Sequence, residues 1–184
     1  MKLITRNHYL NKLIDVKNTP DIKVITGVRR SGKSKLMDAF IDILEKEENA
    51  NVIRIKLNLK EFEKLKDKEE LYKYVQDHYK KEYTNYLLVD EIQLCKDFEV
   101  IINSLHEEEK FDIYLTGSNA FLLSSDLATH IAGRYVSFKI TPFTFSEVLE
   151  LLNIKDKRQN KNNNVFFKSF FTKISHECTK GHSR

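Results

Sequence analysis

Cysteine, proline and tryptophan are scarce in this sequence of 184 residues, which contains two cysteines, two prolines and no tryptophan. Cys95 and Cys178 lie far apart in the sequence and show no metal-type spacing, so we expect thiols buried in the protein and no disulfide bridge between them. None of the six histidines pairs with an acid or a cysteine at ligand spacing. The sequence therefore contains neither a zinc motif nor a nucleophile elbow.

Long hydrophobic runs are also missing. No stretch approaches the ~18 apolar residues of a membrane span, and the first six residues lack the apolar core of a signal peptide. Hydrophobic residues make up 41% of the chain and charged residues 32%, which is typical of a soluble globular protein. We expect one ordinary domain, located in the cytoplasm and without a membrane partner.

The positive charge is not spread over the chain. The net charge of +4 divides into −2 over residues 1–150, with 23 Lys/Arg and 25 Asp/Glu, and +6 over residues 151–184, with 8 Lys/Arg and 2 Asp/Glu. A nucleic-acid partner is conceivable, but the charge of the main part does not support one.

Two of only five glycines belong to the stretch that carries most chemical information. Residues 27–34, GVRRSGKS, match the pattern G-x-x-x-x-G-K-[ST] of a phosphate-binding loop. Gly27 and Gly32 permit backbone torsions that turn consecutive N–H groups toward the phosphates. Lys33 is expected to reach the β and γ phosphates, and the Ser34 hydroxyl to ligate Mg²⁺. The predicted nucleotide-binding residues are Gly27, Val28, Arg29, Arg30, Ser31, Gly32, Lys33 and Ser34.

The surroundings of this loop have the required form. Residues 22–26 form a short run rich in β-branched side chains, as in a buried strand. The apolar residues from Leu36 to Leu44 recur at helical spacing. A strand before the loop and a helix after it place the phosphates at a helix N-terminus, where unpaired N–H groups favour negative charge.

Another apolar strand, predicted over residues 86–91, ends in Asp90 and Glu91. Central parallel strands deliver their last residues to the crevice where ligands bind. We expect Asp90 to hold Mg²⁺ through water and Glu91 to activate the water that attacks the γ-phosphate. The alternative for the pair is an acidic helix cap.

Two further positions are candidates for catalytic roles. Ser118 and Asn119 follow the strand predicted over residues 111–116, where a polar group can sense the γ-phosphate or simply cap a helix. Arg134 precedes the strand predicted over residues 135–140 and is expected to reach a phosphate in its own chain or in a neighbour, as an arginine finger. A surface ion pair is the alternative for Arg134.

Periodicity predicts the remaining elements. Strict alternation over residues 52–59 indicates a strand at a sheet edge. Helices are expected over residues 3–17, 67–83, 97–110 and 119–132, with Tyr9 either stacking on a base or packing. A short helix through Leu152 ends the domain predicted over residues 1–153. Residues 154–184 read as a polar linker and a poorly structured basic tail.

Five blocks together resemble a family of prokaryotic AAA-type P-loop ATPases. They are the loop at residues 27–34, Leu88–Gln93, Thr116–Asn119, Ala132–Tyr135 and Pro142–Glu147, in the family's order. The resemblance implies an α/β, three-layer fold with a five-stranded, mainly parallel sheet, in which an extra strand lies between the two phosphate-site strands. It also implies Mg-ATP as ligand and Glu91 as catalytic acid. Members usually continue into a larger, nuclease-like C-terminal region, so we expect this chain to be a C-terminally shortened form.

Two functions remain open at this stage. The first is an ATP hydrolase whose turnover drives a conformational change. The second is an ATP-dependent switch or binding module with little hydrolysis, acting on a protein or DNA partner. A kinase of small molecules fits less well, because the sequence shows no arginine-rich lid.

Overall fold

The computed structural model of the chain describes residues 6–118, 133–143 and 147. The chain divides into two units, Met1–Thr144 and Phe145–Arg184, and the fold described below is that of the first. The domain boundary predicted near residue 153, the tail beyond it and the helix expected over residues 119–132 lie outside the described residues and stay predictions.

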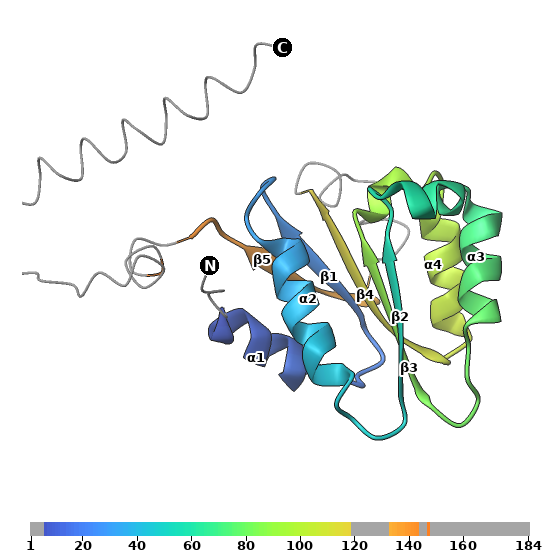
Figure 1. The fold of residues 1–184 in the computed structure, drawn as a ribbon, viewed down its shortest axis with the longest axis horizontal. Coiled ribbons are helices and arrows are strands. Elements are labelled where there is room, and N and C mark those ends of the chain that lie inside the picture. Colours follow the sequence, from blue (N-terminus) through green and yellow to red (C-terminus); the bar gives the residue numbers. More distant parts are fainter. Residues whose placement is uncertain (1–5, 119–132, 144–146, 148–184) are drawn as a thin grey trace, which may run out of the picture. The chain divides into compact units, whose positions relative to one another are not determined.

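Five parallel strands form one sheet (Figure 1). They are β1 (Ile22–Gly27), β2 (Ala50–Lys56), β3 (Thr84–Asp90), β4 (Phe111–Ser118) and β5 (Tyr135–Ile140). The spatial order is β2-β3-β4-β1-β5, so the extra strand β4 lies between β1 and β3 and the predicted fold class is confirmed. Because the strands are parallel, the carboxyl ends of β1, β4 and β3 meet side by side at one edge of the sheet.

Helices cover both faces of this sheet (Figure 1). They are α1 (Asn7–Asp15), α2 (Lys33–Leu44), α3 (Lys68–Asp77) and α4 (Phe98–Glu107), with 3₁₀ turns η1 (Lys60–Lys66) and η2 (Ile92–Leu94). Within the described residues, no helix has the length and apolar character needed to cross a membrane.

Three predicted boundaries are wrong by several residues, among them the end of the helix expected over residues 97–110, which ends at Glu107. The helix expected over residues 67–83 starts as predicted, with the Asp67 carboxylate accepting the N–H of Glu70 at 3.2 Å, but it ends at Asp77. The Asn85 side chain bonds both the N–H of Lys80, at 3.0 Å, and its carbonyl, at 2.9 Å. This pair holds the chain in a turn, which replaces the predicted last helical residues. Similarly, the edge strand predicted to Leu59 stops at Lys56, before η1.

The sheet separates two hydrophobic clusters, because successive strand residues point to opposite faces. Val24 packs with residues of α3 and α4, whereas its neighbour Ile25 packs with residues of α1 and α2. Residues of β1 are buried throughout, while β2 and β5 are only partly buried, as expected for edge strands. Each fully buried large aliphatic side chain stabilises the fold by about 1.5–3 kcal/mol, so the central strands are held firmly and their ends are fixed in space.

Candidate functional site

The loop between β1 and α2 is stabilised by the lysine at its end. Lys33 is the first residue of α2, and its side chain is 5% exposed. The Nζ atom donates to the carbonyl oxygens of Gly27 at 3.1 Å and Val28 at 3.3 Å. The side chain of Lys33 therefore reaches back to the first two residues of the loop.

The two glycines of the loop are required for different reasons. Gly32 has φ +95°, a left-handed conformation that strains other residues. The φ of Gly27 is not positive. However, a Cβ at this position would lie 2.5 Å from the carbonyl oxygen of Ile140 in β5 and 2.7 Å from Ser31 Oγ. The expectation that unusual torsions require Gly27 is thus wrong: space between β1 and β5 requires it.

The acidic pair at the end of β3 is held by a threonine of β4. Asp90 is 1% exposed, and its Oδ1 accepts a hydrogen bond from the Thr116 hydroxyl. The same hydroxyl oxygen accepts the backbone N–H of Glu91 at 3.0 Å. One side chain therefore orients both predicted acids.

Glu91 leaves the strand in a left-handed conformation, with φ 59° and ψ 48°. This torsion turns the chain sharply into η2, and the half-buried carboxylate accepts a hydrogen bond from Gln93 Nε2. The glutamate is fixed by its backbone on one side and by an amide on the other.

Ser118 ends β4 at the same edge of the sheet. It lies opposite Gly27 in the register of β4 and β1 and is half-buried. Asn119, the other predicted sensor, lies outside the described residues.

Arg134 lies at the opposite end of the strands, where they begin. Its carbonyl oxygen accepts the N–H of Ile22 at 2.8 Å, at the start of β1, whereas the loop follows the end of that strand. Six residues of strand separate the two edges by about 20 Å. Its side chain makes an ion pair of 2.5 Å with Glu107. The prediction that Arg134 reaches the phosphate of its own chain is therefore wrong, and the alternative of a surface ion pair describes its surroundings.

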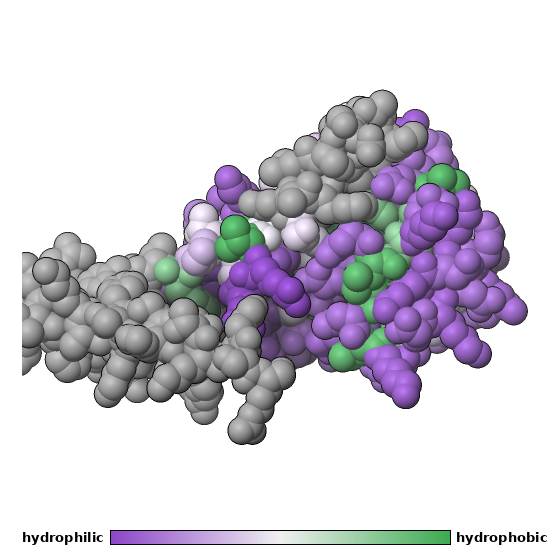
Figure 2. All heavy atoms as spheres, turned by 90° about the horizontal axis from the view of Figure 1, so that it is seen from above, coloured by the Kyte–Doolittle hydropathy of each residue, from purple (hydrophilic) through white to green (hydrophobic). Residues whose placement is uncertain are grey.

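Two cavities flank the loop at this edge. One, of about 360 Å³, is lined by Arg6, Leu10, Arg30, Gly32, Lys33, Ser34, Lys35, Leu36, Ala39, Glu91 and Phe143. The other, of about 440 Å³, is lined by Arg29, Lys33, Asn58, Glu91, Gln93, Leu94 and Ser118. Lys33 and Glu91 are common to both. Figure 2 looks down on this edge, where most of the visible coloured surface is hydrophilic.

Residues 19–149 match the family described as AAA domain. The chain belongs to this AAA family. The match covers β1, the loop, β3 and β4 with the acidic pair and Ser118. With the fold described above, it makes this protein an AAA-type P-loop ATPase domain.

Two relatives of the AAA domain are uncharacterized proteins. One, from Haemophilus influenzae, is 41% identical over 155 residues, which are 83% of this chain and 39% of that protein. The other, from Methanocaldococcus jannaschii, is 30% identical over 172 residues, which are 86% of this chain and 35% of that protein. The chain thus spans well under half the length of the curated relatives it matches.

Solved structures show the same fold at low identity. Cdc6p from Pyrobaculum aerophilum superposes with a TM-score of 0.62 and 13% identity, over 83% of this chain and 49% of that chain. A subunit of Drosophila ORC, in a structure bound to DNA, gives a TM-score of 0.57 and 10% identity, over 82% and 46% of the two chains. These likenesses support the fold of the AAA domain.

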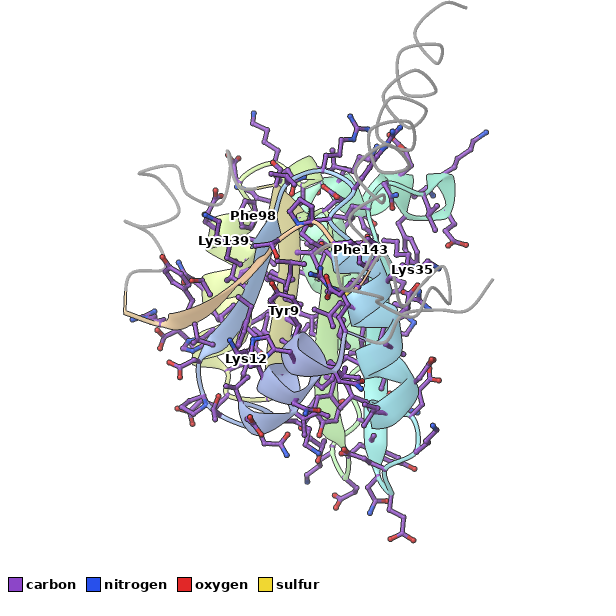
Figure 3. All side chains as sticks on the ribbon, turned by 90° about the vertical axis from the view of Figure 1, so that its left-hand side faces the viewer. Tyr9, Lys12, Lys35, Phe98, Lys139 and Phe143 are labelled. Carbon is purple, nitrogen blue, oxygen red and sulfur yellow. The ribbon has the colours of Figure 1, made fainter. Side chains whose placement is uncertain are left out.

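Arg6 was not expected to take part in the site. Its side chain is 7% exposed, and Nη1 donates to the carbonyl oxygens of Ser31, at 3.2 Å, and Thr141, at 2.7 Å. The guanidinium carbon also lies 4.5 Å from the centre of the Tyr9 ring and 5.2 Å from that of Phe143. Figure 3 labels both aromatic residues, on α1 and beyond β5. Arg6 therefore joins three separate segments beside the loop.

Tyr9 packs within these contacts, and its stacking on a base stays a prediction. Its hydroxyl is 3.0 Å from Thr141 Oγ1, and its ring packs against the cluster under α2. Thr116 and Gln93 likewise belong to blocks that the sequence singles out, but the roles of their side chains became visible only in the structure.

Proposed function

We propose that this AAA domain binds Mg-ATP in the cytoplasm and hydrolyses it, and that turnover drives a conformational change. One observation carries the proposal: Lys33, the cation at the phosphate-binding loop, and Glu91, the candidate catalytic acid, line the same two cavities. A cation and an acid facing one space beside a phosphate-binding loop suit attack of water on a bound phosphoryl group.

In the proposed reaction, the backbone N–H groups of the loop and the ammonium of Lys33 hold the phosphates of ATP. The carboxylate of Glu91 accepts a proton from water as the water oxygen bonds to the γ-phosphorus. The bond between that phosphorus and the β,γ-bridging oxygen breaks, and its electron pair stays with ADP. The products are ADP, phosphate and a proton, which Glu91 returns to solvent. In this proposal, the hydroxyl of Ser118 binds a phosphate oxygen or the water.

The residues present fit a magnesium ion. Ser34 and Asp90 would hold it, directly and through water, and both offer the oxygen atoms that Mg²⁺ prefers. Within the described chain no cluster of three or more His, Cys, Asp or Glu residues could hold a metal. Mg²⁺ takes one or two protein ligands together with phosphate oxygens and waters, so the oxygen atoms of Ser34 and Asp90 are sufficient in number. When bound, the ion supplies positive charge that neutralises the phosphates.

A second function remains as the alternative. In it, the domain binds ATP, hydrolyses little and presents a nucleotide-dependent surface to a protein or DNA partner. The negative net charge of residues 1–150 favours a protein over a nucleic acid. An action of Arg134 on the site of a neighbouring chain stays a prediction.

Substitution Glu91→Gln distinguishes the two functions. For the hydrolase, we expect turnover to fall by about 10²–10⁴-fold, while the dissociation constant for Mg-ATP changes by less than about threefold, which corresponds to ~0.65 kcal/mol. Phosphate release and nucleotide titration are measured on the same samples. A robust hydrolysis rate that the substitution leaves untouched would show that Glu91 is not the catalytic acid, and a slow, unchanged rate would favour the switch.

A further inference from the structure

Two neighbouring arginines at the tip of the phosphate-binding loop line different cavities. Arg29 lines the cavity of about 440 Å³, together with Glu91, Gln93 and Ser118. Arg30 has φ +66° and lines the cavity of about 360 Å³, together with Ser34 and Phe143. Arg29 and Arg30 thus line cavities on two sides of one loop. Of these two cavities, only that of Arg29 is also lined by Ser118 and by Gln93, whose side-chain amide donates to Glu91.

The guanidinium of Arg29 is available for a ligand. The residue is exposed, and it makes no hydrogen bond or ion pair with any part of the chain that the structure describes. By contrast, Arg6 is buried and donates to two carbonyl oxygens, and Arg134 pairs with Glu107 at the far edge of the sheet. Within the described residues, Arg29 combines an unpaired charge with a place beside both Glu91 and Ser118, whereas Arg30 shares its cavity with Glu91 but not with Ser118.

The chemistry of this cavity calls for such a charge. Phosphoryl transfer spreads negative charge over the equatorial oxygens of the γ-phosphoryl group in its transition state. A guanidinium offers a planar fork of donors that matches two of these oxygens. Lys33 bonds the carbonyls of Gly27 and Val28 and lines the same cavity as Arg29, so a phosphoryl group bound there would meet two cations.

We propose that Arg29 is a catalytic residue that contacts the γ-phosphoryl group of ATP bound to its own chain. This proposal rests on the proposed function. It gives Arg29, in the loop itself, the phosphate-contacting role that the sequence suggested for Arg134. It further predicts that Arg29 discriminates the transition state from ADP, because ADP has no γ-phosphoryl group to contact.

The test compares Arg29→Ala and Arg29→Lys with two controls. Lys12→Ala removes one exposed positive charge from α1, away from both cavities. Arg30→Ala removes the neighbouring charge, on the side of the other cavity. For each variant we would measure kcat and KM for ATP, the dissociation constant of ADP, and the trapping of ADP by aluminium fluoride, which mimics the transferred phosphoryl group. Thermal unfolding reports whether each variant is folded.

For Arg29→Ala we expect kcat to fall by about 10³-fold or more, trapping by aluminium fluoride to be lost and the dissociation constant of ADP to stay within about threefold. Arg29→Lys should be intermediate, because a single ammonium cannot bond two oxygens in the plane. Lys12→Ala should match the unmutated chain, and any effect of Arg30→Ala should appear in KM more than in kcat.

Three results would overturn the proposal. The first is a kcat of Arg29→Ala within about threefold of the unmutated chain. The second is an equal loss of affinity for ADP and for the trapped complex, which would make Arg29 a general binding residue. The third is recovery of hydrolysis on mixing the Arg29→Ala chain with a Lys33→Ala chain, which would show action between chains. If the unmutated chain binds ATP without turnover, the hydrolase fails separately, and trapping alone decides the role of Arg29.

Discussion

The hydroxyl of Thr116 donates a hydrogen bond to the carboxylate of Asp90, from strand β4 to strand β3. The two residues are 26 positions apart in the chain and become neighbours only because β4 is inserted between β1 and β3. Since the same oxygen accepts the N–H of Glu91, the insertion of β4 fixes the geometry of both acids. The extra strand is thus part of the site and not only of the scaffold.

Substitution Thr116→Val should damage the site. Valine has nearly the same shape but can neither donate to Asp90 nor accept from Glu91, and buried groups left without a partner cost about 1–3 kcal/mol. We expect this loss in chemical denaturation and a lower rate of ATP hydrolysis. Thr116→Ser keeps the hydroxyl and is the matched control. Equal stability and equal activity of the two variants would mean that the hydroxyl does not orient the acids.

The two loop glycines should respond differently to alanine. At Gly27 the added Cβ would meet the backbone oxygen of Ile140 at 2.5 Å, so β1 and β5 must separate, at a cost of about 1–3 kcal/mol. At Gly32 the Cβ meets nothing within 4 Å, and only the left-handed backbone is strained, by about 1–2 kcal/mol.

Amide hydrogen exchange distinguishes the two effects. The two substitutions cost similar amounts of stability, but they should weaken the protection of amides in different parts of the fold. In Gly27→Ala the amides of β5 should lose protection relative to those of β3. In Gly32→Ala the amides of β5 should keep theirs, and the change should stay near the start of α2. Full protection of β5 in Gly27→Ala would contradict the close contact.

Cys95 should react very slowly in the folded protein. The thiol is free, as the sequence predicted, and 1% exposed. Burial, helped by the negative charges of Asp67 and Glu99, raises the pKa of the thiol to about 12. At pH 8.5 the thiolate fraction is then about three orders of magnitude below that of an ordinary cysteine. Alkylation of a Cys178→Ala variant, with and without denaturant, measures the difference.

The same shift in pKa predicts how stability depends on pH. The unfolded chain releases the thiol proton near pH 9, whereas the folded chain keeps it until about pH 12. Between these values the unfolded state binds fewer protons, so the contribution of Cys95 lowers the free energy of unfolding as the pH rises. Replacement of Cys95 by alanine should remove this part of the alkaline decrease. A Cys95 thiol that reacts equally fast with and without denaturant would contradict both statements.

Much of the fold follows from local sequence patterns. The five strands and the helices after the loop are visible as apolar runs and helical stripes, because burial on a sheet face or a helix stripe selects residue types locally. The place of β4 in the sheet is different. Chain order does not determine spatial order, and only the resemblance to a family placed the strand of Thr116 between those of Thr26 and Asp90.

The errors have physical causes of two kinds. Arg134 directly precedes a parallel strand, so it belongs to the edge where strands begin, opposite the loop, and this follows from the topology once β5 is known to be parallel to β1. Arg6, in contrast, bonds residues 25 and 135 positions away, and no periodicity reveals contacts at such separations. The side chain of Asn85 bonds the backbone of Lys80 and holds a turn where α3 was expected to continue. The apolar pattern does not reveal this turn.

Titration of Mg-ATP against the chain, with Lys33→Ala alongside, tests the central claim most directly. The unmutated chain should bind, and loss of the ammonium at the loop should weaken binding by about 100-fold or more, which corresponds to the ~2.8 kcal/mol of a charged hydrogen-bonding group. Circular dichroism would confirm that both chains are folded. Equal binding by the folded Lys33→Ala chain, or no binding by the folded unmutated chain, would contradict a nucleotide site at this loop.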